Sequence, residues 1–219
     1  MRLANPRAAR CATPFAVALA LLAAAGCASP PDAPSSSESA ADGGSFKALG
    51  RARAPVTVIE YTDLQCPYCA RFALNTFPEL RRLYVDTGKV RFESRDLPLP
   101  FHPYAIPAAV AARCAGEQGR YWEYRESLLS RQNELPVSPY DEVAGQLGLE
   151  RGAFSACRTD GRQAQNVRLE AASASAQGIT ATPSFVIGRT VEGQFVGETI
   201  QGAQPLAVFK EKIEALLKQ

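Results

Sequence analysis

Tyr61-Thr62-Asp63-Leu64-Gln65-Cys66-Pro67-Tyr68-Cys69 contains two cysteines separated by two residues, after an apolar run at 56–59 and before a helical pattern. Two cysteines at this spacing are either a redox pair or half of a zinc site. Zinc needs two further soft ligands at close spacing. The later cysteines are far apart and the sequence has one histidine, so the strand-then-helix context favours a redox pair without a metal.

The order of the two cysteines indicates a role for each. Cys66 is expected at the N-cap of the helix, where unpaired N–H groups and the positive end of the helix dipole stabilise a thiolate. Its pKa should therefore lie below the roughly 8.5 of free cysteine. Pro67 suits the first helical position, because its missing N–H would have had no partner there. Cys66 is then the nucleophile, and the less exposed Cys69 is the resolving thiol.

This motif, together with Thr182-Pro183 far downstream, resembles the DsbA-like thioredoxin-fold family of bacterial envelope thiol-disulfide oxidoreductases. The resemblance covers about residues 46–219 and implies an α/β thioredoxin fold with a helical insertion at about 103–178. It also implies that no bound cofactor is needed.

The resemblance extends to individual residues. It implies that Pro183 is cis and faces the active disulfide, and that Thr182 tunes Cys66. The backbone beside Pro183, with Pro67 and Tyr68, would bind an extended substrate by strand addition.

Glu60 interrupts the apolar strand at 56–62. A carboxylate is costly to bury, so either its pKa rises or it finds a partner. It is either a strand-end residue with solvent access or a buried acid that exchanges a proton with Cys69. DsbA-like proteins have a glutamate six places before the first active cysteine, which is the place of Glu60.

The beginning of the chain is typical of an exported lipoprotein. Arginines and an apolar stretch too short for a normal spanning helix indicate a signal peptide over 1–26. It ends in Ala24-Ala25-Gly26-Cys27, which resembles a lipobox, although Ala24 replaces the usual leucine. Cys27 is expected to be lipidated, and 27–45 to be a disordered tether rich in Ser, Pro, Ala and Gly. Ordinary cleavage and a soluble secreted protein are the alternative.

Charge and cysteine number narrow the functional class. Without the three signal arginines, 21 basic residues oppose 22 acidic ones, which does not suggest a nucleic-acid partner.

Cys11 leaves with the signal and Cys27 is lipidated, so four cysteines remain. Proximity favours the pairs Cys66–Cys69 and Cys114–Cys157 among three pairings, and an oxidising compartment. The second pair is read as structural, with a second redox centre as the alternative; some DsbA-like proteins have such a disulfide in the insert.

The remaining pattern fits one thioredoxin core. Two strands flank a helix and should be parallel through a right-handed crossover, and Pro78 should kink that helix. Gly188 is expected to begin a turn, His102 to be a turn or capping residue, and Trp122 to join insert and core. The other expected strands are 90–94, 184–187 and 194–200. The last helix is expected at 205–217.

The sequence therefore predicts a monomeric envelope oxidase, anchored by lipid and facing the periplasm or extracytoplasmic space. Its clients would be exported proteins with free thiols, and a membrane partner would reoxidise its cysteines. Isomerases of this branch bring an N-terminal dimerisation domain, whereas a tether is expected at that place here. A reductase or isomerase of the same fold remains an alternative. A lipoprotein chaperone that binds extended polypeptides is an alternative of another class.

Overall fold

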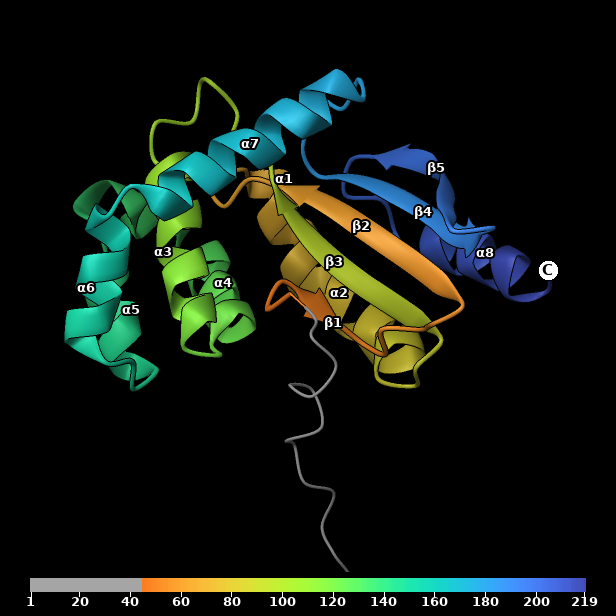
Figure 1. The fold of residues 1–219 in the computed structure, drawn as a ribbon, viewed down its shortest axis with the longest axis horizontal. Helices are drawn as coiled ribbons and strands as arrows, with labels where there is room; N and C mark the ends of the chain where they lie inside the picture. Colours follow the sequence, from red (N-terminus) through yellow and green to blue (C-terminus); the bar gives the residue numbers. More distant parts are fainter. Residues whose placement is uncertain (1–44) are drawn as a thin grey trace, which may run out of the picture. The chain divides into compact units, whose positions relative to one another are not determined.

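A computed structural model describes residues 45–219, which form a five-stranded sheet flanked by helices (Figure 1). The strand order is β1-β3-β2-β4-β5, with β2 parallel to β3 and the other pairs antiparallel. The strands are β1 (Ala48–Leu49), β2 (Val56–Thr62), β3 (Val90–Asp96), β4 (Ser184–Val191) and β5 (Gln194–Gln201). The predicted thioredoxin fold with a helical insertion is confirmed, while β1 had not been expected.

The helix that begins after Cys66 runs on through alternating helical types. Its segments are α1 (Pro67–Arg71), the π-helical η2 (Phe72–Thr76), α2 (Phe77–Leu80) and the π-helical η3 (Arg81–Val85). Pro78 has no N–H to donate, and the turn before it is π-helical, so the bonding pattern shifts around the proline and the helix is not broken. With the C-terminal α8 (Leu206–Leu217), this helix covers one face of the sheet.

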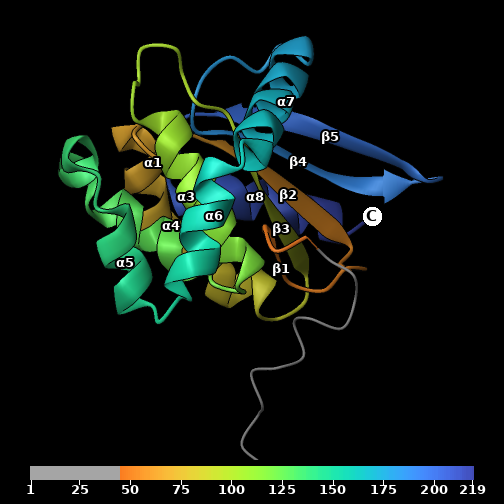
Figure 2. The ribbon, with the colours of Figure 1, turned by 60° about the vertical axis from the view of Figure 1, so that its left-hand side comes forward.

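The helical insertion lies between β3 and β4, close to the predicted bounds (Figure 2). Its last helix packs on β3, on the opposite face of the sheet from α1. The helices are α3 (Ala105–Glu117), α4 (Tyr121–Ser130), the 3-10 helix η4 (Gln132–Val137), α5 (Tyr140–Gln146), α6 (Arg151–Thr159) and α7 (Arg162–Ala176). Of these, α4 packs on α1 and η2 of the active-site helix, α3 and α5 pack on α4, and α6 packs on α3 and α5.

Two large apolar clusters hold insert and core together. One centres on Phe72, which packs on aromatic rings of β3, β4 and α8. The other fills the insert and includes both cysteines of the motif. Trp122 of α4 packs against both clusters, so it joins insert to core as the sequence indicated.

Gly188 does not begin a turn, and that expectation is wrong. It lies inside β4, which continues to Val191 before the hairpin to β5. A Cβ atom at Gly188 would lie 2.0 Å from the Val196 carbonyl oxygen. The glycine is therefore needed for close approach between two strands.

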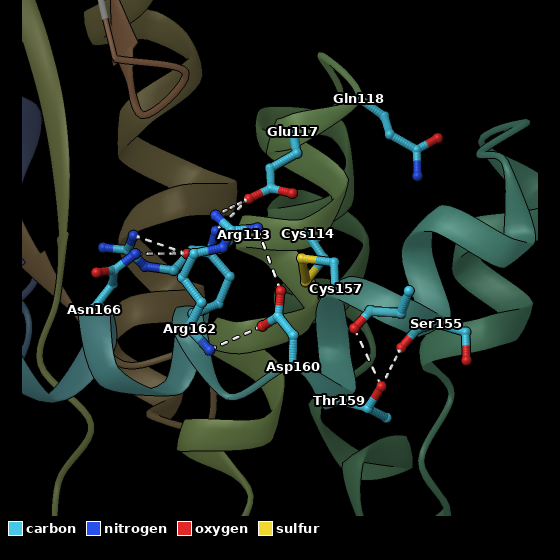
Figure 3. The surroundings of a disulfide bond; sticks show 12 residues. Arg113, Cys114, Glu117, Gln118, Ser155, Cys157, Thr159, Asp160, Arg162 and Asn166 are labelled. Carbon is cyan, nitrogen blue, oxygen red and sulfur yellow. Dashed lines mark hydrogen bonds and ion pairs between the residues drawn. A yellow bond between two sulfur atoms is a disulfide. The ribbon is translucent and has the colours of Figure 1, made fainter.

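A disulfide joins Cys114 of α3 to Cys157 of α6 (Figure 3). Both cysteines are buried, and their sulfurs lie in the apolar cluster of the insert. Next to the bond, Arg162 of α7 forms an ion pair with Glu117 of α3. The bond thus ties two insert helices whose cysteines are 43 residues apart.

We expect the double substitution Cys114→Ala and Cys157→Ala to lower the free energy of unfolding by up to about 4 kcal/mol, because it releases a long closed loop in the unfolded chain. Urea denaturation of the variant and the wild type measures the loss. Thiol-disulfide exchange at Cys66 should persist in the double variant if it is folded. Loss of exchange in a folded variant would instead indicate a redox role for this bond.

Candidate active site

Cys66 lies at the N-cap of α1, with extended backbone angles (φ −73°, ψ 123°) and Pro67 at the first helical position. This is the arrangement that the sequence predicted. Cys66 retains 3% exposure and Cys69 none, whereas the Tyr68 side chain between them is 55% exposed. The motif is therefore open to solvent at Tyr68, Cys66 retains a small exposed area, and Cys69 is shielded from solvent.

The two thiols have opposite acidities. The pKa of Cys66 falls to about 5, chiefly through a hydrogen bond with the Cys69 thiol, and further through Thr182 and the backbone N–H groups of Tyr68 and Cys69. Burial opposes this shift. Burial is the main cause that raises the pKa of Cys69, and the neighbouring Cys66 adds to it. At neutral pH the site therefore contains a Cys66 thiolate and a Cys69 thiol.

The Thr182–Pro183 peptide bond is cis, and it lies just before β4. The Thr182 carbonyl oxygen is 3.5 Å from Cys66 Sγ and accepts a hydrogen bond from the thiol when Cys66 is protonated. The fold thus brings together two segments 116 residues apart. The Thr182 hydroxyl is buried and has no hydrogen-bond partner of standard geometry among residues 45–219, although its proximity contributes to the low pKa of Cys66.

Glu60 is fully buried in β2, so the interpretation as a solvent-exposed strand end is wrong. Nη2 of Arg125, from α4, donates to both carboxylate oxygens of Glu60 at 2.8 and 2.7 Å. Burial raises the pKa of Glu60, and the Arg125 cation opposes that rise without cancelling it. Both expectations for a buried carboxyl group, a raised pKa and a partner, are met at once.

The sequence analysis missed Asp63 as a residue of the site. Its carboxylate is buried and accepts hydrogen bonds from the backbone N–H groups of Gln65 (2.7 Å) and Leu99 (2.8 Å). Nδ1 of His102 lies 2.8 Å from the same carboxylate. The backbone N–H of Asp63 points to Cys69 Sγ at 3.4 Å. Asp63 therefore ties the loop before the cysteines to the segment that begins the insert.

A second missed residue is Gln132 of η4. Its side-chain amide donates to the carbonyl oxygens of Leu64 and Cys66, both at 2.9 Å. His102 acts as a partner of Asp63, which agrees with a positioning role and not with attack on a client. The sequence signals available for this network were the position of Asp63 inside the motif and the single histidine.

Within 45–219, no three His, Cys, Asp or Glu side chains converge as a metal site would require. In the same range, no helix is long and apolar enough to span a membrane. The expected signal peptide, the expected lipidation site Cys27 and most of the expected tether lie outside the described residues.

Comparison with known proteins identifies the family of this chain. Residues 44–203 match the family described as Thioredoxin. The Na(+)/H(+) antiporter NhaA 3 of Salinispora tropica is 38% identical over 156 residues, which are 70% of this chain and 23% of the antiporter. The crystal structure of alpha-DsbA1 from Wolbachia pipientis is 27% identical, with a TM-score of 0.70 over 78% of this chain and 90% of that one. A thioredoxin-like oxidoreductase from Silicibacter pomeroyi is 25% identical, with a TM-score of 0.61 over 78% and 92%.

The chain belongs to the thioredoxin family. Within it, the sequence and the helical insertion make it a member of the DsbA-like thioredoxin-fold group. The chain spans less than a quarter of the antiporter that it matches.

We expect the reduced protein to show a thiolate transition near pH 5, since the folded site lowers the pKa of Cys66 to about 5 from an ordinary value of 9.0. Thiolate absorbance near 240 nm, followed against pH, measures it. Cys66→Ser should abolish the transition, and a transition near pH 9 in the wild type would contradict it.

The same shift predicts a pH dependence of stability for the reduced protein. A group with a lower pKa in the folded state stabilises it fully above its unfolded pKa and loses that contribution as pH falls through the folded pKa. The contribution of Cys66 ionisation to the free energy of unfolding should therefore rise between about pH 5 and 9 in the reduced wild type. It should be absent in Cys66→Ser.

Proposed function

We propose that this protein is a thiol-disulfide oxidoreductase of the DsbA type that forms disulfides in exported proteins. The observation that carries the proposal is the pair of thiols with opposite acidities, a Cys66 thiolate facing Thr182 and a buried Cys69 thiol. Cysteine reactivity follows the thiolate, and a low pKa also makes a thiolate a good leaving group. Both properties suit Cys66 to exchange with client thiols.

The reaction follows from these positions. A client thiolate attacks Sγ of Cys66 in the oxidised pair, the Cys66–Cys69 bond breaks, and its electron pair passes to Cys69. The product is a mixed disulfide between client and Cys66. A second client thiolate then attacks the client sulfur and expels Cys66 as a thiolate. The client gains a disulfide, the pair gains two electrons, and a membrane redox partner takes them up.

The client would lie against the cis-Pro183 segment. The Thr182 carbonyl oxygen is next to Cys66 Sγ, and the backbone that precedes Pro183 would pair with an extended peptide by strand addition. Pro67 and the exposed Tyr68 would form the other wall. Arg71 stacks on the Tyr68 ring, with its guanidinium carbon 4.9 Å from the centroid, so the ring is held beside the opening.

The cellular setting is part of the proposal. Removal of the signal peptide and lipidation of Cys27 would place a monomeric domain on a membrane, facing the periplasm or extracytoplasmic space. A buried Cys114–Cys157 disulfide supports an oxidising compartment. Glu60, buried behind Cys69, is the proposed proton store of the reaction.

We expect Cys69→Ala to accumulate a mixed disulfide between Cys66 and a client that has one thiol, because such a client cannot expel Cys66 itself and the Cys69 thiol that would release it is gone. Incubating the purified variant with a peptide that contains a single cysteine and with an oxidant, followed by non-reducing electrophoresis and mass spectrometry, measures the adduct. Cys66→Ser is the matched control and should form no adduct at position 69, since that sulfur is buried. An adduct at Cys69 instead of Cys66 would refute the assigned roles.

The reduction potential separates an oxidase from a reductase. For an oxidase we expect equilibrium with glutathione to give a value near the oxidising end of the thioredoxin-fold range, about −120 mV. A value near about −270 mV would make the protein a reductase that draws electrons from a membrane donor. The Cys66→Ser variant shows the baseline signal of the assay.

A further inference from the structure

The proton that Cys69 gains or loses during exchange has no access to bulk water. Neither Cys69 nor Glu60 retains any exposed surface. The hydrogen bonds of standard geometry to the Glu60 carboxylate come from Arg125, and Cys69 Sγ accepts one from the Asp63 N–H. A further group is needed to carry a proton between the acid and the thiol.

Thr62 is placed to be that group. It follows Glu60 by two residues on β2, so both side chains point to the same face of the sheet. The peptide group between Thr62 and Asp63 donates its N–H to Cys69 Sγ at 3.4 Å, which places Thr62 beside that sulfur. Burial raises the pKa of both the Glu60 carboxyl and the Cys69 thiol, and interaction with the Thr62 hydroxyl opposes both rises.

The hydroxyl of Thr62 is also unusual in its pairing. Thr62 is 2% exposed, and its Oγ1 is buried without a hydrogen bond of standard geometry to the described residues. Leaving a buried hydroxyl unpaired destabilises the folded state. Valine has nearly the same shape and would fill this place without that cost. A hydroxyl that is close to two titrating groups but locked to neither can rotate between them.

We propose that the Thr62 hydroxyl relays protons between Glu60 and Cys69. This inference rests on the proposed function and names a further residue of its site. When a client thiolate breaks the Cys66–Cys69 bond, the new Cys69 thiolate takes the proton of the Thr62 hydroxyl, and Thr62 takes the proton of the Glu60 carboxyl. Arg125 then neutralises the carboxylate that is left. The transfers reverse when the pair is oxidised again and Cys69 must lose its proton.

The test compares Thr62→Val, which removes the hydroxyl, with Thr62→Ser, which retains it. The readout is the rate at which dithiothreitol reduces the oxidised Cys66–Cys69 pair between pH 5 and 9, followed by quenching and thiol alkylation. General acid catalysis contributes roughly 100-fold or more, and we expect Thr62→Val to slow the reaction at least tenfold at neutral pH and to change its pH profile. Thr62→Ser should react within about threefold of the wild type.

Thr57→Val is the matched control, because Thr57 lies on the same strand with its side chain on the opposite face. It should react at the wild-type rate. A Thr62→Val protein with the wild-type rate and pH profile would overturn the relay. A loss in Thr62→Val that Thr62→Ser does not restore would overturn it as well, since it would indicate packing. Melting temperatures of all three variants verify that each is folded.

Failure of the relay and failure of the proposed function give different results. The relay is tested with a small thiol, so it does not depend on client oxidation or on a membrane partner. A protein that fails to oxidise dithiol peptides, yet shows the Thr62 effect with dithiothreitol, retains the relay and loses the proposed function. The reverse combination retains the function and loses the relay.

Discussion

The burial of Cys69 is the constraint on which the site depends. A thiol with no contact with water resists ionisation, so the pair can hold one negative charge at Cys66 and not two. The Cys69 thiol then donates to the Cys66 thiolate and is the largest cause of its low pKa. Burial of one sulfur therefore produces the reactivity of the other. Without the Cys69 thiol, Cys66 would lose the largest cause of its low pKa.

The helical insertion provides that cover and also holds the active-site loop in place. Gln132 binds the carbonyl oxygens on both sides of Gln65, and Leu99 and His102 bind Asp63. Arg125 of the insert neutralises Glu60 of the core. A buried ion cluster reinforces the same junction: Lys47 bonds to both Asp96 and Glu170 at 2.7 Å, and Arg113 of α3 bonds to the same pair. Burial would raise the pKa of Asp96, but the two cations hold it below its ordinary value.

The motif around Cys66 and Cys69, with its resemblance to a known family, was enough to predict the fold and the centre of the site. The apolar run of β2 and the proline after Cys66 each reflect short-range rules, and the structure follows them. Long-range contacts were not accessible in the same way. Nothing near Arg125 in the sequence shows that it meets Glu60, and Lys47 gives no sign that it closes an ion cluster with α7. The position of Gly188 was misread because its reason is the backbone of a neighbouring strand, not a local turn.

The same constraint bears on the direction of electron flow. A Cys66 thiolate exists in the reduced protein and not in the disulfide, so whatever stabilises it favours the reduced state and makes the disulfide more oxidising. With a pKa of about 5, ionisation at pH 7 stabilises the reduced form by about two pKa units, which corresponds to roughly 60 mV for a two-electron couple. Thr182 and the first-turn N–H groups contribute to this thiolate, and a cysteine in a disulfide does not offer them a negative charge. The residues that stabilise the Cys66 thiolate are thus the ones that make the disulfide form of the pair a better electron acceptor.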